Sequence, residues 1–172
     1  MKKTVAKNLI IGALSAGVVL SPLASQYSDL STPVSASTTV FQEDFSAGLS
    51  GWANDWADIG TVNGNKYAHI QSGEHMPSFP GSGGVIFDIG FLEKNISGIA
   101  KGKRYKITFR ASGVGNFYIN RSETINVNTG GINMNSAQSF SYEGVCNSDV
   151  LNLFFMTFGT TMGVDDIKLE VL

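Results

Sequence analysis

The clearest pattern in the chain is a two-residue alternation of apolar and polar side chains in the stretch 101–111, which opens with a Gly turn. One face carries Tyr105, Ile107, Phe109 and Ala111, and the other carries Lys106, Thr108 and Arg110. Alternation with period two indicates a β-strand. A strand with one apolar and one charged face belongs to a sheet that is packed on one side only. The stretch therefore predicts an antiparallel sandwich.

Short segments of similar character recur along the rest of the chain, separated by turn residues. They lie at 39–45, 59–62, 66–70, 85–91, 116–120, 125–129, 137–142, 151–158 and 164–171. Asn63-Gly64 predicts a hairpin turn, Ser112–Gly115 is expected to turn the chain between two strands, and 92–101 to cross between sheets or hold one helical turn. The segment 151–158 is apolar on both faces, which predicts a central strand. This spacing, without a helix of conventional length, predicts an all-β fold, a single β-sandwich of jelly-roll type.

The N-terminal segment has the character of a secretory signal peptide. Three lysines precede an apolar run at 9–20 that is too short to span a membrane comfortably. Two cleavage positions fit, one near 24–26 and one after residue 36. We assign 1–36 to a signal peptide and a short Ser/Thr/Pro segment, and 37–172 to one β-sandwich domain, a size that supports a hydrophobic core.

Charge and reactive side chains argue against several function classes. Without 1–36 the chain keeps nine basic and thirteen acidic residues, a net charge of −4, whereas nucleic-acid binding needs clustered Lys and Arg. A single cysteine, Cys146, excludes an intramolecular disulfide and is interpreted as a buried apolar residue. His69 and His75 lack the spacing of a zinc motif. No catalytic motif stands out, so we expect no enzyme.

Three motifs together resemble the galactose-binding-like jelly rolls of secreted carbohydrate-binding modules, of the xylan- and glucan-binding type. They are the opening run Phe41–Trp52 with its Gly-x-x-Gly-Trp, the strand at 101–111 with its Gly-Lys-x-Tyr, and the closing run Gly163–Leu172 with its Asp-Asp-Ile. The resemblance spans most of the mature chain and implies a sugar-binding jelly roll. In this motif the Trp, here Trp52, is usually a core residue.

Two groups of side chains are candidates for ligand binding. A sugar site needs an exposed aromatic platform beside planar hydrogen-bonding groups, because a pyranose ring presents an apolar face and a rim of hydroxyls. The first candidate group is Trp52 and Trp56 with the polar residues between and after them. The second is Arg110 with Tyr118 and Asn120, which we expect to lie close together across the 112–115 turn. Alternative interpretations are a core role for Trp52 and an ordinary solvated sheet face for the second group.

The resemblance also implies a structural calcium ion between the first and last strands, held by hard oxygen ligands. The matching acids in this chain are Glu43, Asp44, Asp165 and Asp166. Ser46 follows the motif Phe where the family commonly has an acid, which removes one ligand. The alternative for the terminal Asp-Asp pair is a turn at the start of a strand.

These observations predict a secreted, extracellular, non-catalytic binding module, with a polysaccharide or cell-surface glycan as its partner. We expect no nucleic-acid partner and no membrane span in the mature form. The alternative is an extracellular structural or adhesive protein that self-associates or binds a matrix or host protein, with Phe154, Met156 or Phe158 supplying an apolar patch.

Overall fold

The computed structural model describes residues 36–75 and 86–172, so the expected signal peptide and part of the loop after residue 71 lie outside the described residues. The described segments form twelve strands and one short 3-10 helix. In chain order these are β1 (Thr38–Glu43), β2 (Ala53–Asp55), β3 (Ala57–Val62), β4 (Asn65–Gln71), β5 (Glu74–His75), β6 (Ile86–Phe87), β7 (Gly90–Ser97), β8 (Arg104–Ile119), β9 (Glu123–Asn128), η1 (Met134–Ser136), β10 (Gln138–Val145), β11 (Val150–Thr157) and β12 (Thr161–Val171).

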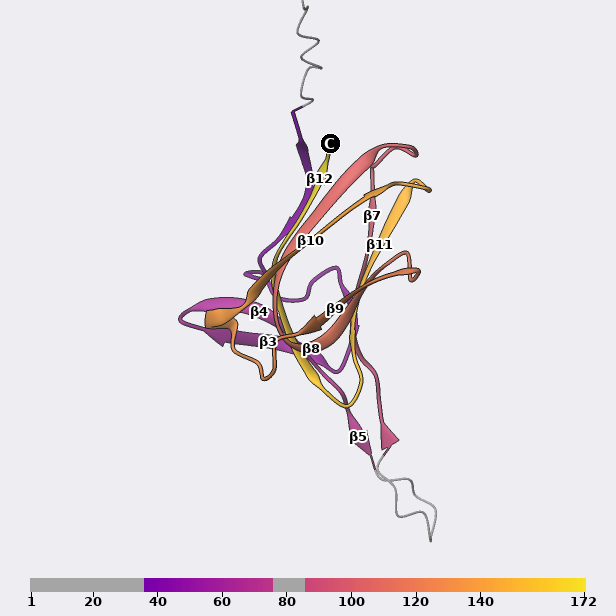
Figure 1. Ribbon diagram of the computed structural model, residues 1–172. Helices are drawn as coiled ribbons and strands as arrows, with labels where there is room; N and C mark the ends of the chain where they lie inside the picture. Colours follow the sequence, from indigo (N-terminus) through magenta and orange to yellow (C-terminus); the bar gives the residue numbers. More distant parts are fainter. Residues whose placement is uncertain (1–35, 76–85) are drawn as a thin grey trace, which may run out of the picture. The chain divides into compact units, whose positions relative to one another are not determined.

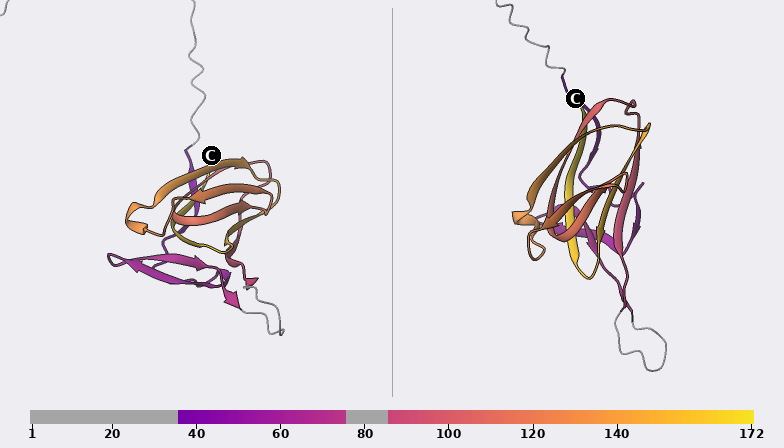
Figure 2. Two further views of the ribbon diagram at one scale, coloured as in Figure 1. Left: turned by 60° about the horizontal axis from the view of Figure 1, so that its bottom comes forward. Right: turned by 45° about the vertical axis from the view of Figure 1, so that its right-hand side comes forward.

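The strands form two large sheets that share β8, and β5 and β6 pair separately as a two-stranded sheet (Figure 1). In the first sheet β3, β4, β12, the first half of β8 and β10 follow one another, and β1 pairs with the C-terminal half of β12. In the second sheet the order is β2, β7, β11, the second half of β8 and β9. Every pairing between described strands is antiparallel. The predicted all-β sandwich of jelly-roll type is confirmed, and so is the hairpin closed at Asn63-Gly64. That hairpin lies beside η1, where Asn63 donates a hydrogen bond to Asn135 over 2.6 Å (Figure 2).

The expected turn at Ser112–Gly115 is wrong, because β8 continues through it as one strand of 16 residues. The glycines of this segment serve close backbone contact instead of chain reversal. Gly113 has a φ of 101°, and a Cβ there would lie 2.2 Å from the Thr161 carbonyl oxygen. A Cβ at Gly115 would lie 2.8 Å from the Met156 carbonyl oxygen. The absence of side chains at these positions lets β8 pass from one sheet to the other against its neighbours.

A second correction concerns 85–101, which was expected to hold one buried strand and then a crossing or helical turn. The structure instead ends β6 at Phe87 and starts β7 at Gly90. Gly90 lies directly against the backbone at the end of β4, since a Cβ there would lie 2.1 Å from the Gln71 carbonyl oxygen. β7 then alternates buried Leu92 and Ile96 with less buried residues, so it is an ordinary half-buried strand.

Phenylalanines from both halves of β8 and from β11 fill the space between the sheets. Phe109 lies 4.8 Å from Phe117 and 5.2 Å from Phe155 between ring centroids, and Phe117 lies 4.5 Å from Phe155. All three are buried, and together with the side chains around them they form one continuous core. The prediction of a central strand at 151–158 is confirmed, because β11 lies between β7 and β8.

The steric role of Gly113 can be tested against a second glycine with a positive φ. Gly130 also has a positive φ, 85°, but a Cβ there would meet no atom within 4 Å. Both Gly→Ala substitutions carry the left-handed strain, of about 1 kcal/mol. Only Gly113→Ala also forces a side chain onto the Thr161 carbonyl. We expect Gly113→Ala to lower the free energy of unfolding by at least about 2 kcal/mol more than Gly130→Ala, measured by urea denaturation. Equal losses of unfolding free energy in the two variants would contradict a close contact between Gly113 and the Thr161 carbonyl.

Candidate functional site

An open groove of about 690 Å³ lies on the face of the second sheet that is turned away from the core. We call it the aromatic groove. Its lining combines four aromatic rings with carboxylates and one guanidinium: Asp55, Trp56, Asp88, Ile89, Phe91, Glu93, Arg121, Phe154 and Phe158. These residues come from β2, β7 and β11, from the turn after β8 and from loop positions beside the strands. The strands that build the second sheet therefore position the groove directly.

A row of aromatic side chains crosses three adjacent strands at the groove. Phe91 of β7 lies 5.7 Å from Phe154 of β11 between ring centroids, and Phe154 lies 5.9 Å from Tyr118 of β8. Phe154 and Tyr118 are direct partners in the register of β11 with β8. Because side chains alternate along a strand, the buried Phe117 and Phe155 send their neighbours Tyr118 and Phe154 to the outer face. The alternation that buries Phe117 and Phe155 in the core therefore also places the row of aromatic side chains on the outer face.

Trp56 forms a platform at the β2 end of the groove. The backbone of Trp56 has a φ of 50°, and the Trp56 carbonyl accepts a hydrogen bond from the Gln71 amide over 2.9 Å. The indole lies against the backbone of Gly73, where a Cβ would be 2.2 Å from Cε2 of the ring. The residue nevertheless remains 44% exposed. One side of the indole is therefore supported by the protein while other parts remain available to a ligand.

Polar groups are fixed beside the aromatic row. Arg121 Nη2 lies 2.9 and 2.8 Å from the two carboxylate oxygens of Glu93, and Asn152 Nδ2 donates to Glu93 Oε1 over 2.7 Å. Burial by itself would raise the pKa of Glu93, but the hydrogen bonds from Arg121 and Asn152 and the charge of Arg121 outweigh it and hold the pKa below its usual value. The guanidinium carbon of Arg121 also lies 5.0 Å from the centroid of the Phe154 ring. Glu93 is therefore ionised and held in place.

The structure separates the residues that the sequence grouped together. Trp52 is a core residue, 6% exposed, whose Nε1 donates to Glu43 Oε2 over 3.0 Å. Asn120 ties β8 to β11, since its Oδ1 accepts from the Asn152 amide over 2.9 Å. Arg110 lies on the part of β8 that belongs to the first sheet, so the expected cluster of Arg110, Tyr118 and Asn120 is wrong. Of the predicted binding residues, Trp56 lines the aromatic groove and Tyr118 packs against it.

Seven lining residues were not predicted as sugar contacts, namely Asp88, Ile89, Phe91, Glu93, Arg121, Phe154 and Phe158. The sequence contained a signal for one of them, because Phe154 occupies an even position in a strand whose odd positions form the core. The partners that they meet across strands depend on the strand order, which the sequence pattern does not specify.

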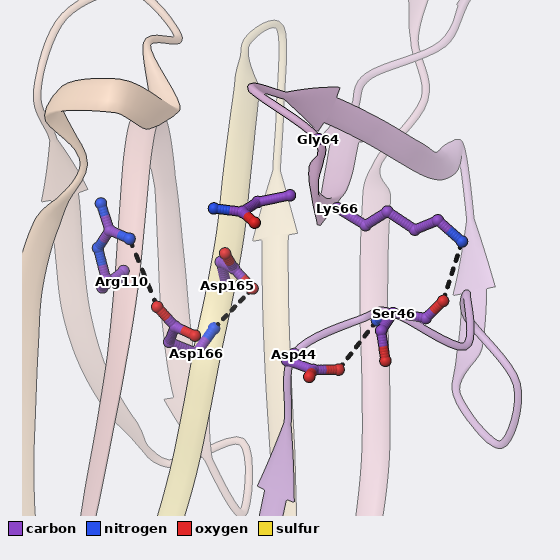
Figure 3. A pocket seen from close by; sticks show the side chains of 8 residues that line it. Asp44, Ser46, Gly64, Lys66, Arg110, Asp165 and Asp166 are labelled. Atoms are coloured by element: carbon purple, nitrogen blue, oxygen red, sulfur yellow. Dashed lines mark hydrogen bonds and ion pairs between the residues drawn. The ribbon is translucent and has the colours of Figure 1, made fainter.

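The predicted metal ligands partly converge on a second cavity, of about 310 Å³, which we call the seam pocket (Figure 3). It is lined by Asp44, Ser46, Gly64, Asn65, Lys66, Arg110, Asp165 and Asp166. Arg110 Nη1 lies 3.4 Å from Asp166 Oδ2, and Lys66 Nζ donates to the Ser46 carbonyl over 2.9 Å (Figure 3). The pocket therefore brings three carboxylates together with two cationic side chains.

Glu43 does not join the other three acids. Its carboxylate accepts hydrogen bonds from the Phe45 amide and from Trp52 Nε1, both at 3.0 Å. Burial raises the pKa of Asp165 to about 6, and the charges of Asp166 and Asp44 add to this effect while the Asp166 amide and Arg110 oppose it. The oxygen donors suit calcium chemically. Across residues 36–75 and 86–172, however, no three acidic, His or Cys side chains are grouped closely enough to hold a metal ion.

Comparison with known proteins adds information on the fold. No family model matches the sequence, and no curated protein matches it. Among solved structures, the tandem CBM22-1–CBM22-2 domain of Xyn10C from Paenibacillus barcinonensis has a TM-score of 0.52 at 9% identity, over 80% of this chain and 46% of that one. The CBM22-1 xylan-binding domain of the same protein has a TM-score of 0.50 at 10% identity, over 79% of this chain and 96% of that one.

A third similar structure is the xylohexaose complex of the CBM22-1–GH10 modules of the Clostridium thermocellum xylanase Xyn10B. It has a TM-score of 0.49 at 14% identity, over 78% of this chain and 28% of that one. This chain thus spans less than half the length of two of the three structures. The resemblance expected from the sequence is confirmed for the fold: the domain is a jelly roll of the kind found in carbohydrate-binding modules. Within the described part of the chain, no helix is long and apolar enough to cross a membrane.

The support of Trp56 by Gly73 leads to a test that requires no ligand. We expect Gly73→Ala to push the indole off the backbone, because the added Cβ occupies the position of the ring. Trp52 is buried, so acrylamide quenches mainly Trp56, and quenching should increase in the variant. Gly131→Ala is the matched control, since a Cβ there meets no atom within 4 Å. Unchanged quenching in Gly73→Ala would show that the indole does not depend on Gly73.

Proposed function

We propose that this protein is a secreted, non-catalytic binding module that holds a polysaccharide or cell-surface glycan in the aromatic groove. The observation that carries the proposal is the row of Phe91, Phe154 and Tyr118 next to the supported indole of Trp56. A sugar ring has an apolar face that packs on such rings and hydroxyls that bond to fixed polar groups. Glu93 and Arg121 supply an acceptor and a donor of this kind beside the row, and Asn152 holds Glu93 in place.

The arrangement of the rings favours an extended oligosaccharide over a single sugar. Adjacent strands lie about 4.8 Å apart, so rings on neighbouring strands form a track across the sheet. The groove volume of about 690 Å³ falls within the range of small-molecule sites. The similar domain from Xyn10C is described as xylan-binding, which supports a glycan as the ligand class.

A binding role without catalysis is supported by the state of the groove acid Glu93. A general acid must carry a proton at working pH, whereas hydrogen bonds and the charge of Arg121 keep the Glu93 carboxylate ionised. Glycoside hydrolysis requires one protonated and one ionised carboxyl group beside the scissile bond. We therefore assign Glu93 to hydrogen bonding and charge.

Replacement of Trp56 by Ala should weaken glycan binding by about thirtyfold, because a central Trp contact typically contributes about 2 kcal/mol. Pull-down on insoluble xylan, cellulose, chitin and peptidoglycan identifies the ligand, and titration calorimetry with a soluble fragment measures the loss. Tyr67→Ala, which removes a half-buried aromatic side chain from the first sheet, is the control and should leave affinity unchanged.

Failure of all four materials to retain the protein would favour the alternative of an extracellular structural or adhesive protein. The observation behind this alternative is the exposure of large apolar side chains at the same groove, with Phe158 61% and Ile89 47% exposed. Size-exclusion chromatography at several concentrations separates the two functions, because a self-associating protein elutes earlier as concentration rises.

We also propose that the seam pocket takes up a structural calcium ion once Asp44, Asp165 and Asp166, which are not grouped closely enough in the structure to hold it, move together around the ion. These acids lie where β1 ends beside the middle of β12, and Asp165 is nearly buried. A divalent cation would offset the mutual repulsion of the carboxylates and fasten the two terminal strands. Uptake requires Asp166 to exchange its contact with Arg110 for the ion.

Chelation should lower the melting temperature of the calcium-loaded protein, since an ion that binds only the folded state adds about 2.7 kcal/mol at a hundredfold excess over Kd. Asp166→Asn should remove most of this effect, and Asn tolerates the φ of 51° found there. Asp149→Asn, an exposed acid outside the seam pocket, is the control. Glycan binding should persist at a temperature where the chelated protein is folded. Identical melting curves with calcium and with chelator would contradict the site.

A further inference from the structure

The aromatic groove carries an excess of negative charge. Three carboxylates, from Asp55, Asp88 and Glu93, line it together with one guanidinium, from Arg121. Arg121, the one cation among the described lining residues, is already engaged, since it pairs with both oxygens of Glu93 and lies over the ring of Phe154. Within the described residues, no ion pair involves Asp55. The carboxylate of Asp55 therefore adds negative charge next to the aromatic rings.

The position of Asp55 connects this charge to the aromatic platform. Asp55 precedes Trp56 in the chain, and its Oδ1 accepts a hydrogen bond from the Trp56 amide over 3.1 Å. Across the β2–β7 pairing Asp55 is the direct partner of Phe91. Its carboxylate thus belongs to the same end of the groove as the two rings. A ligand that stacks on Trp56 lies beside a carboxylate that is exposed to solvent.

We propose that the groove selects a glycan that carries protonated amines, of the glucosamine-polymer class, and this inference rests on the glycan-binding function proposed above. A protonated amine is attracted by the carboxylate of Asp55 and by the faces of aromatic rings. A uronic-acid polymer would meet like charge at the same positions and is disfavoured. A neutral glycan can stack on the aromatic rings of the groove, but the negative charge of Asp55 adds nothing to its affinity.

The test compares two hexasaccharides with the same backbone and linkage, chitohexaose and its fully deacetylated counterpart. Calorimetry is carried out at low salt and at a pH where the amines are protonated and the groove carboxylates are ionised. We expect the deacetylated form to bind about tenfold more tightly, from ion pairs and cation–π contacts combined. This ratio should shrink as salt is added, because exposed charges are screened.

Asp55→Asn should lower the ratio severalfold, since the amide still accepts the hydrogen bond from the Trp56 amide but carries no charge. Asp149→Asn removes the same charge from an exposed loop outside the groove and should leave the ratio unchanged. A lysine oligomer of equal charge forms the third arm. It should not displace the deacetylated hexasaccharide, because it has no sugar rings to stack on the platform.

The outcomes separate this inference from the function on which it rests. Equal or weaker binding of the deacetylated form, an unchanged ratio in Asp55→Asn, or displacement by the lysine oligomer would each overturn the amine preference. Retention on a neutral polysaccharide with no response to amines would overturn the preference alone and leave glycan binding in place. Failure to bind any glycan, charged or neutral, would overturn both.

Discussion

One strand, β8, belongs to both sheets of the sandwich, and the rest of the fold depends on its register. Its odd positions from Tyr105 to Ile119 are all buried, and Ser112 is the one even position that is buried as well, so the odd positions face the core in both halves. Phe109 in the first sheet and Phe117 in the second can therefore meet across the core with ring centroids 4.8 Å apart. A slip of one residue would exchange every core side chain of β8 for a polar neighbour. Such a slip would therefore destabilise both sheets at once.

The same strand determines which polar residues can cooperate in a site. Arg110 and Tyr118 both point away from the core because both occupy even positions of β8. Eight residues of strand separate them, at most about 26 Å, and they lie in different sheets. Arg110 consequently joins Asp165 and Asp166 in the seam pocket, while Tyr118 packs on Phe154 beside the aromatic groove. The sandwich therefore separates a charged cavity from an aromatic one.

Local alternation was sufficient to predict the class of fold and much of the core. Tyr105, Ile107 and Phe109 are buried as their spacing predicts, and the Asn63-Gly64 hairpin forms. The segment 112–115 could not be interpreted in the same way, because Ser and Gly are favoured both at turns and where two backbones approach closely. The difference depends on the Thr161 carbonyl against Gly113, a contact between residues far apart in the sequence.

For the candidate sites, the sequence identified individual residues better than their partners. Trp56 was selected as a ligand contact and lines the aromatic groove. Asp44, Asp165 and Asp166 meet in the seam pocket, while Glu43 turns to the Trp52 indole. Arg121 gave no local signal, because its pairing with Glu93 arises only when β7, β11 and the turn after β8 lie side by side. Strand order brings these residues together, and strand order is a non-local property.

Each of the two cavities is lined by a residue with an uncommon backbone conformation. Six non-glycine residues of the described chain have positive φ, and two of them are Trp56 and Asp166, with φ of 50° and 51°. For a bulky residue such as Trp this conformation is costly and persists only where the surroundings impose it. At Trp56 the hydrogen bonds with Asp55 and Gln71 and the contact with Gly73 provide that constraint. The strain is consistent with selection for a fixed and accessible ring, which a stacking site for a sugar requires.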